Sequence, residues 1–171
     1  EWRSGRRWII DPIDGTRDYV RGNPMWANLI GLEVGGEVVA GIVNLPGLGL
    51  LYSASKSAGA YRNGSAIHAS LKVAPAESVL CLDGFNKLGH TPFRDRLLDW
   101  IDPFWAVRSL GGAPDAMMIA AGQAVLWIEP TADAMGLAPL NIIINAAGGR
   151  LFELDSRCRN YGGTGVRFCS D

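Results

Sequence analysis

Apolar residues along the chain fall into short runs that are separated by glycine pairs, prolines and polar turns. The runs at 26–34 and 37–45 are typical of β-strands, and Gly35-Gly36 lies between them, which is a hairpin signal. An apolar run at 8–10 is typical of a short buried strand. Further strands are expected at 50–53, 79–82, 105–108, 125–128 and 150–154. The first part of the chain is therefore predicted to be an antiparallel meander.

The second half of the chain alternates strands with helices, which are expected at 92–101, 113–122 and 136–147. The helix at 136–147 has one apolar face. Pro139 is expected in its first turn, where proline is tolerated, and Gly148-Gly149 is expected to end it. A meander followed by alternating strands and helices predicts an α+β fold in layers, with residues 1–171 forming a single domain.

Composition and charge narrow the class of protein. A hydrophobic fraction of 48% and a charged fraction of 19% are typical of globular proteins. The net charge of -1 offers no basic field for nucleic acid or for an anionic membrane. Cys81, Cys158 and Cys169 form no C-x-x-C pair, which fits a reducing cytoplasm. The first residues lead almost directly into a strand, so we expect the chain to be a fragment.

The segment DPIDGT at residues 11–16 carries the strongest candidate chemistry. Carboxylates at spacing three do not share a face of a regular strand, so we expect the strand to end at Pro12 and the chain to turn. Asp11 and Asp14 can then converge, with the Ile13 carbonyl facing the same point. Hard oxygen ligands of this kind suit Mg²⁺. The alternative is an ordinary turn, because Asp-Pro and Asp-Gly are common turn pairs.

Gly15-Thr16 follows the two carboxylates and is predicted to begin a helix. The free N–H groups and the positive dipole end of a helix start favour a phosphate. Thr16 can cap this helix or orient a water. Arg17 and Arg21, at helical spacing, either attract a phosphorylated substrate or form a solvated face.

Four segments of the sequence resemble the inositol monophosphatase family, which consists of Mg²⁺-dependent, lithium-sensitive sugar-phosphate phosphatases. WIIDPIDGT is similar to the family's first signature, and RDYVRGNPMWANLIGLEVGGEVVAGIVNLP continues it in register, closest to the branch of bacterial histidinol-phosphate phosphatases. GGAPDAMMIAAGQAVLWIEP resembles the family's substrate-binding turn, helix and strand, and MGLAPLNIIINAAGGRLF resembles its second signature. The resemblance implies a layered α/β/α/β/α sandwich of the sugar-phosphatase type, without its N-terminal helical part.

The resemblance also implies roles for individual residues. Asp11, the Ile13 carbonyl and Asp14 would bind Mg²⁺, and Asp14 and Thr16 would be catalytic, with Thr16 helping to activate the attacking water. The residues implied in substrate binding are Gly15, Thr16, Gly111, Gly112, Ala113 and Glu129. Gly15 and Thr16 would bind the phosphate through backbone N–H groups. Glu129 would accept a hydrogen bond from a hydroxyl or an amine of the substrate. Without the resemblance, a solvated glutamate at a strand end is an equal interpretation of Glu129.

The chain departs from the family pattern at two places. The second signature normally contains W-D, which reads Met135-Gly136 here, so Gly136 occupies the position of a lost metal ligand. Asp133 lies three residues earlier, and we do not expect it to substitute. A Gly-Glu-Glu that the family carries upstream of DPIDGT is not in this chain, and Glu1 is too close to Asp11 to take that role.

The leading hypothesis is a phosphoric monoester hydrolase that cleaves histidinol phosphate or an inositol or sugar phosphate by in-line attack of metal-activated water. We expect a cytoplasmic homodimer that binds a small phosphorylated substrate and neither nucleic acid nor membrane. A rival is the haloacid-dehalogenase-like class, whose D-x-D-G-T motif has closer carboxylates and no intervening proline. A second rival is a homologue that binds a sugar phosphate without efficient hydrolysis, which Gly136 favours.

Overall fold

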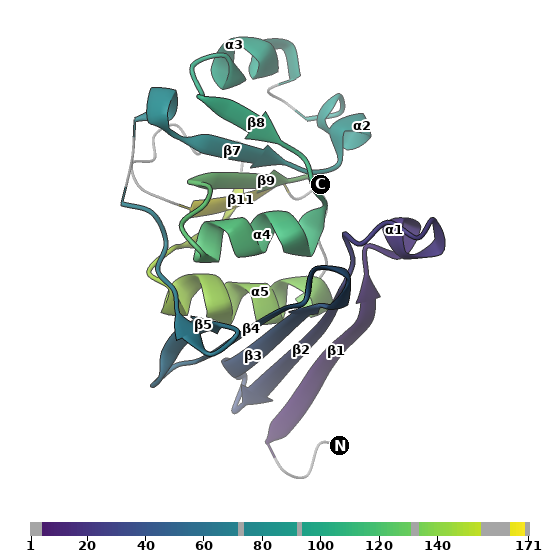
Figure 1. Ribbon diagram of the computed structural model, residues 1–171, viewed down its shortest axis with the longest axis vertical. Helices are drawn as coiled ribbons and strands as arrows, with labels where there is room; N and C mark the ends of the chain where they lie inside the picture. Colours follow the sequence, from purple (N-terminus) through teal and green to yellow (C-terminus); the bar gives the residue numbers. More distant parts are fainter. Residues whose placement is uncertain (1–4, 72–73, 92–93, 131–133, 155–164, 170–171) are drawn as a thin grey trace.

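Two β-sheets organise the computed structural model, which describes residues 5–71, 74–91, 94–130, 134–154 and 165–169 (Figure 1). The first is an antiparallel six-stranded sheet with strands in chain order: β1 (Arg6–Asp14), β2 (Ala27–Val34), β3 (Glu37–Leu45), β4 (Leu50–Ser55), β5 (Gly59–Arg62) and β6 (Ser65–Ala66). The second is parallel, in the order β10-β11-β9-β7-β8: β7 (Val79–Leu82), β8 (Ala106–Arg108), β9 (Leu126–Glu129), β10 (Leu151–Leu154) and β11 (Gly165–Cys169).

The predicted hairpin is confirmed in the first sheet. β2 and β3 pair antiparallel, with Val34 opposite Glu37 and Asn28 opposite Asn44. The two residues between the strands, Gly35 and Gly36, have φ angles of 60° and 85°. Two successive left-handed residues give the turn whose twist matches that of the strands, and glycine adopts this conformation without steric cost.

The longer helices lie between the two sheets. Figure 1 shows α4 (Gly112–Ala120) and α5 (Ala134–Ala146) between them. The main core joins buried residues of both helices to Leu29 and Val43 of the first sheet and to Cys81 and Trp127 of the second. Among the described residues, no helix is both long and apolar enough to cross a membrane.

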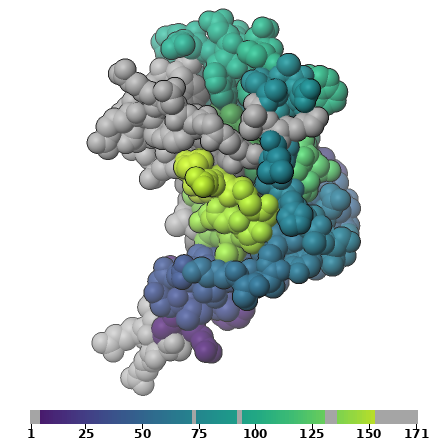
Figure 2. Space-filling view, turned by 90° about the vertical axis from the view of Figure 1, so that its left-hand side faces the viewer, coloured from purple at the N-terminus to yellow at the C-terminus, as the bar shows by residue number. Residues whose placement is uncertain are grey.

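The opposite face of the second sheet packs on short helices. Leu80, Leu82 and Ile128 form a smaller core with Leu88 of α2 (Phe85–Leu88) and Leu97 of α3 (Leu97–Ile101). Side chains alternate along a strand, so one sheet serves both cores. The layers are therefore α2/α3, parallel sheet, α4/α5 and antiparallel sheet. In the view of Figure 2 the antiparallel sheet lies at one end of the molecule, with the end of α5 between it and the region of α3 and β8.

The remaining elements are short and lie in the connections. They are α1 (Thr16–Val20) and the 3₁₀ turns η1 (Pro46–Leu48), η2 (Pro75–Glu77) and η3 (Arg94–Arg96). Of the helix expected at 92–101, the structure has η3 followed by α3, and residues 92–93 lie outside the described part. α5 begins at Ala134, two residues earlier than predicted. The predicted placement of Pro139 in the first turn is therefore wrong, because Pro139 is the sixth residue of α5.

Pro139 lies where α5 packs very closely on two glycines of the first sheet. Gly31 and Gly41 are directly opposite each other on β2 and β3. A Cβ atom on Gly41 would lie 2.4 Å from Cγ2 of Ile142 and 2.9 Å from the Pro139 carbonyl oxygen. A Cβ on Gly31 would lie 3.5 Å from Cγ of Pro139, an ordinary contact. The glycine pair forms a notch in the sheet, and Gly41 sets how closely α5 approaches.

This packing predicts different costs for two alanine substitutions in the same notch. Gly41→Ala should destabilise the chain by about 1–3 kcal/mol, since overfilling a packed core forces backbone or side chains apart. Gly31→Ala is the matched control and should cost less than about 1 kcal/mol. Urea unfolding of both variants measures the two free energies. Equal costs would show that the α5 contact at Gly41 does not limit the packing.

Candidate functional site

The DPIDGT segment lies at an irregularity within β1. We expected the strand to end at Pro12, and this was wrong, because β1 continues to Asp14. Asp11 is opposite Leu29 and Asp14 is opposite Ala27, so three steps on β1 match two steps on β2. One extra residue in a strand is a β-bulge, which changes the direction of the following side chain. Since Leu29 and Ala27 are both fully buried, the bulge turns both carboxylates toward the interior.

Polar contacts stabilise the bulge from the neighbouring strands. The Asn28 amide group donates a hydrogen bond to the Pro12 carbonyl at 2.7 Å. Asn44, across the hairpin, donates to the Asn28 side chain at 2.9 Å. The backbone amide of Ile13 donates to Oδ1 of Asp11 at 3.1 Å. The irregular backbone therefore keeps hydrogen-bond partners that a regular ladder would otherwise supply.

The turn after the bulge is formed by Gly15 and Thr16. Gly15 has φ 75° and precedes α1, and a Cβ on it would lie 2.9 Å from the Met25 carbonyl oxygen. α1 has no side-chain cap, so Thr16 does not cap the helix. Its hydroxyl instead donates to the Ile13 carbonyl at 3.0 Å. The lone pairs of the Thr16 hydroxyl are then left to accept a hydrogen bond.

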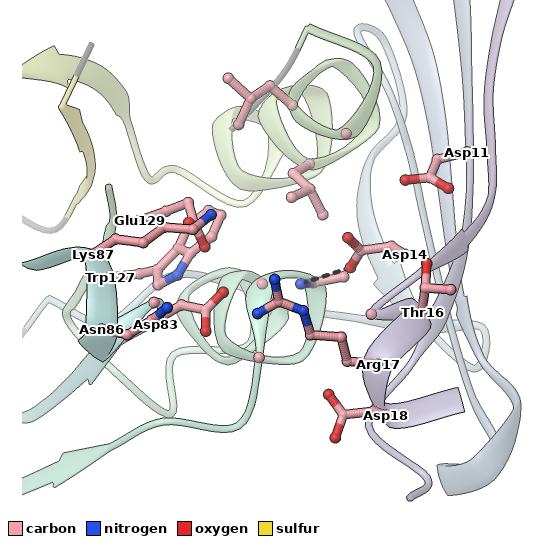
Figure 3. Close-up of a pocket in the computed structure, with 18 residues that line it drawn as sticks. Asp11, Asp14, Thr16, Arg17, Asp18, Asp83, Asn86, Lys87, Trp127 and Glu129 are labelled. Atoms are coloured by element: carbon pink, nitrogen blue, oxygen red, sulfur yellow. Dashed lines mark hydrogen bonds between the residues drawn. The ribbon is translucent and has the colours of Figure 1, made fainter. Parts of the chain in front are cut away.

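A hydrogen bond connects the bulge to a distant part of the chain. The Ala113 amide, in the first turn of α4, donates to Oδ2 of Asp14 at 3.2 Å (Figure 3). Gly111 precedes this turn with φ 115°, a conformation that favours glycine. The contact spans 99 positions of sequence. It brings the end of β1 and the start of α4 to the same place.

The bulge and the start of α4 border a cleft of about 380 Å³. Figure 3 shows Asp11, Asp14, Thr16 and Arg17 on one side and Asp83, Asn86, Lys87, Trp127 and Glu129 on the other. The first group comes from β1 and α1, and the second comes from β9 and from the segment that follows β7. The sequence-predicted residues that line this cleft are Asp11, Asp14, Gly15, Thr16, Gly111, Gly112, Ala113, Glu129 and Gly136.

Three carboxylates face one another across Gly112. A Cβ atom on Gly112 would lie 3.8 Å from Oδ2 of Asp14, Oδ2 of Asp83 and Oε2 of Glu129. Glu129 is only 6% exposed, which excludes the interpretation of a solvated glutamate at a strand end. Glycine at this position leaves the space between the acidic groups open for a ligand.

The crowding of these groups changes the acidity of Asp14. Burial raises the pKa of Asp14 to about 6, the Ala113 hydrogen bond opposes this rise, and the charges of Asp11 and Asp83 add to it. A bound cation would remove the repulsion between the carboxylates. Asp14 is therefore a group whose charged form is stabilised by a positive partner.

The oxygen donors at the bulge fit a hard divalent cation. Within the described ranges, no three His, Cys, Asp or Glu side chains are grouped closely enough to hold a metal. Mg²⁺, however, uses one or two carboxylates and keeps several waters. Asp11 and Asp14 supply two carboxylates, so this donor set fits. Gly136 borders the cleft but adds no side chain, and it is the third residue of α5.

Eight residues that line the cleft were not predicted from the sequence. They are Asp18, Asp83, Gly84, Asn86, Lys87, Trp127, Leu137 and Leu140. Asp83 follows the buried strand β7, which lies beside β9 and is parallel to it. Ligands of parallel sheets bind beyond the carboxyl ends of the strands, and that rule offers the one signal for Asp83. We did not expect Asp133 or Glu1 to take the place of a missing metal ligand. Both residues lie outside the described part of the chain.

Comparison with known proteins adds to this geometry. A model of the inositol monophosphatase family matches residues 1–170. The chain is 35% identical over 171 residues to histidinol-phosphatase from Mycobacterium tuberculosis, covering 95% of this chain and 65% of that protein. It is 32% identical over 156 residues to inositol monophosphatase 1 from Homo sapiens, covering 86% and 55%. The chain thus spans less than two thirds of the length of these curated relatives.

Solved structures agree with the fold. Extragenic suppressor protein suhB from Bartonella henselae superposes with a TM-score of 0.79 at 27% identity, over 85% of this chain and 57% of that chain. An inositol monophosphatase from Zymomonas mobilis gives a TM-score of 0.74 at 27% identity, over 85% and 57%. The predicted α+β sandwich of the sugar-phosphatase type is confirmed, and the described residues contain four of its layers.

The raised pKa of Asp14 predicts how pH affects stability in a metal-free buffer. The folded-state pKa is about 6, against an ordinary value of 3.8. The folded chain therefore loses stability as pH rises from 4 to 7, by up to about 3 kcal/mol. Asp14→Asn keeps an acceptor for Ala113 and lacks this loss. Its stability relative to the parent chain should rise from pH 4 to pH 7 in urea unfolding with a chelator. Parallel pH profiles would contradict the buried position of Asp14.

Proposed function

The chain belongs to the inositol monophosphatase family, and we propose that it is a Mg²⁺-dependent phosphomonoesterase acting on a small phosphate ester. The observation that carries this proposal is the β-bulge, which turns the Asp11 and Asp14 carboxylates toward one cleft. The Ala113 amide holds the second of them. We assign the metal to Asp11, Asp14 and the Ile13 carbonyl.

Mg²⁺ bound there would polarise the phosphoryl oxygens and lower the pKa of a water. The residues of the chain position the carboxylate ligand and the attacking water. Asp14 is held by a hydrogen bond from α4, so its carboxylate has a defined direction in the cleft. The Thr16 hydroxyl, whose proton is donated to the Ile13 carbonyl, can accept a hydrogen bond from the attacking water. Both residues are therefore assigned to catalysis.

The phosphate is assigned to the side of the cleft formed by β1 and α1. The Gly15 and Thr16 amides follow the carboxylates directly and would face a phosphate oxygen. Arg17 borders the same cleft and projects across it in Figure 3. Arg21 follows the last residue of α1, is exposed, and is not among the residues that line the cleft. Arg17 rather than Arg21 is therefore the cation expected to attract a phosphorylated substrate.

The alcohol part of the substrate is assigned to the opposite side, where Asp83 and Glu129 face the cleft. Gly111, Gly112 and Ala113 form the turn between the two sides. Lys87 lies on the same side, but the two carboxylates outnumber it. Carboxylates suit an ammonium group better than a neutral polyol, because they gain charge-assisted hydrogen bonds. This acidic wall, together with the relative from Mycobacterium tuberculosis that is named for histidinol phosphate, favours that ester over inositol phosphate.

The acidic wall predicts a substrate-dependent effect of Asp83→Asn. Binding of histidinol phosphate should weaken by about tenfold, since a charge-assisted hydrogen bond becomes a neutral one. Binding of inositol 1-phosphate should change by less than about threefold. Calorimetric titration of both esters with Mg²⁺ present measures the difference. Equal losses for the two esters would show that Asp83 does not recognise the ammonium group.

Gly136 limits the proposed activity. It borders the cleft at the position where the family carries an aspartate, and a glycine supplies no carboxylate there. Fewer negative ligands hold the metal less tightly and leave its place to water. We therefore propose that the chain hydrolyses phosphate esters poorly.

Gly136→Asp tests this proposal directly. The substitution should raise Mg²⁺ affinity and the rate of hydrolysis by about 10- to 1,000-fold. It should cost little stability, because acidic residues are favourable in the first turn of a helix. The measurement is phosphate release against Mg²⁺ concentration for both forms. Full activity of the parent chain, or no gain from the aspartate, would show that this metal position is misassigned.

We propose that the protein is a cytoplasmic homodimer and that residues 1–171 form one domain. A cytoplasmic location is supported by Cys81, which is a free, buried thiol, and by the spacing of the cysteines, which form no C-x-x-C pair. Size-exclusion chromatography with light scattering measures the mass in solution. A monomeric mass at micromolar concentration would contradict the dimer.

A further inference from the structure

Asp115 is a buried carboxylate that neither the motifs nor the proposed reaction uses. It lies in α4 and is 0% exposed, and all of the other buried residues of that helix are apolar. Placing a charge in the protein interior costs several kcal/mol unless hydrogen bonds compensate for lost water. An apolar residue would avoid this cost. The carboxylate therefore needs an explanation in what it contacts.

The backbone contacts of Asp115 go to the turn that precedes its own helix. The Leu110 amide donates to both carboxylate oxygens, at 3.1 and 3.2 Å, and the Gly111 amide donates to Oδ2 at 3.4 Å. A side chain that reaches back to the amides before a helix fixes the angle at which the chain enters it. The third partner is the Cys81 thiol, whose hydrogen bond, like those of the amides, favours the charged carboxylate.

The turn held by Asp115 is the one that presents the Ala113 amide to Asp14. Leu110 and Gly111 come three and two residues before Ala113, and the Ala113 amide donates a hydrogen bond to Oδ2 of Asp14 at 3.2 Å. A shift of this turn would move the donor away from Asp14 and would move Gly112 within the group of three carboxylates. Asp115 itself does not line the cleft.

We propose that Asp115 is a positioning residue that holds the 110–113 turn and, through the Ala113 amide, sets the direction of the Asp14 carboxylate. Its consequence for metal binding rests on the proposed function. Outer contacts that orient metal ligands typically change metal affinity by about 10- to 100-fold. Loss of the Asp115 contacts should therefore weaken Mg²⁺ binding by at least about tenfold.

The test compares Asp115→Asn with Cys81→Ala. Asparagine keeps the size of the side chain and one acceptor oxygen, but its NH2 group replaces the other oxygen and faces the Leu110 amide, which donates to both carboxylate oxygens of Asp115. Alanine at Cys81 removes the partner of Asp115 that is not part of the turn, and so perturbs the same buried environment without touching the turn. Asp115→Ser, which is too short to reach both amides, is used if the asparagine variant does not fold.

Hydrogen exchange of single amides, followed by NMR, measures directly how often the 110–113 turn opens. In Asp115→Asn, the amides of Leu110, Gly111 and Ala113 should exchange at least about tenfold faster relative to those of Leu29 and Val43 in the first sheet. Cys81→Ala should show no such selective change. Calorimetry should give the loss of Mg²⁺ affinity in Asp115→Asn and not in Cys81→Ala.

Three results would overturn the proposal. The first is a uniform acceleration over the turn and the sheet, which indicates a purely structural role. The second is no selective change at the turn, and the third is a loosened turn with unchanged Mg²⁺ affinity. If the parent chain binds no Mg²⁺, the proposed function fails, while the exchange measurement still decides whether Asp115 holds the turn.

Discussion

The candidate site depends on the hydrogen bond between the Ala113 amide and the Asp14 carboxylate. The two groups lie 99 positions apart in the sequence and belong to different layers of the fold. Asp14 is at the end of a bulged edge strand, and Ala113 is in the first turn of a helix packed in the main core. Each side of the contact is therefore supported by packing. Such a contact fixes the position of one layer relative to the other, and with it the shape of the cleft between them.

Close packing of α5 on the antiparallel sheet supports this arrangement. Gly41 allows α5 to lie so near β3 that an added Cβ would meet Ile142 at 2.4 Å. The beginning of the same helix, at Gly136, borders the cleft. The helix position set by the glycine notch thus determines where the cleft is closed on this side. Packing far from the acidic residues therefore sets the position of one border of their cleft.

Charge gives the cleft its chemistry. Asp14 and Asp115 both have a pKa raised to about 6, chiefly by burial, and the charge of Asp83 contributes to both. Backbone amides compensate for part of this cost at each residue. Three acidic side chains, those of Asp14, Asp83 and Glu129, lie around the centre of the cleft, beside Gly112. This environment favours a cation, either a metal ion or an ammonium group of a ligand.

Much of the framework could be predicted because it depends on local sequence. Gly35-Gly36 between two strand-like runs specifies a hairpin, and alternating strands and helices specify the second sheet. The bulge could not be predicted, because it depends on the pairing of β1 with β2 and not on the order of residues in DPIDGT. Asp83 and Asp115 were missed for the same reason, since their surroundings come from distant segments. The spacing in DPIDGT indicated Asp11 and Asp14 and the resemblance to a family strengthened that interpretation, while their geometry required the fold.

The central claim is that the bulge of β1 forms a site for a divalent cation between Asp11 and Asp14. Mn²⁺ has the same preference for oxygen ligands as Mg²⁺ and gives an anomalous diffraction signal. Crystals of the chain soaked in MnCl₂ should show an anomalous peak about 2.2 Å from carboxylate oxygens of Asp11 and Asp14, and the peak should be lost in Asp14→Asn. A chain that crystallises with both carboxylates ordered and no peak between them at millimolar Mn²⁺ would contradict the account.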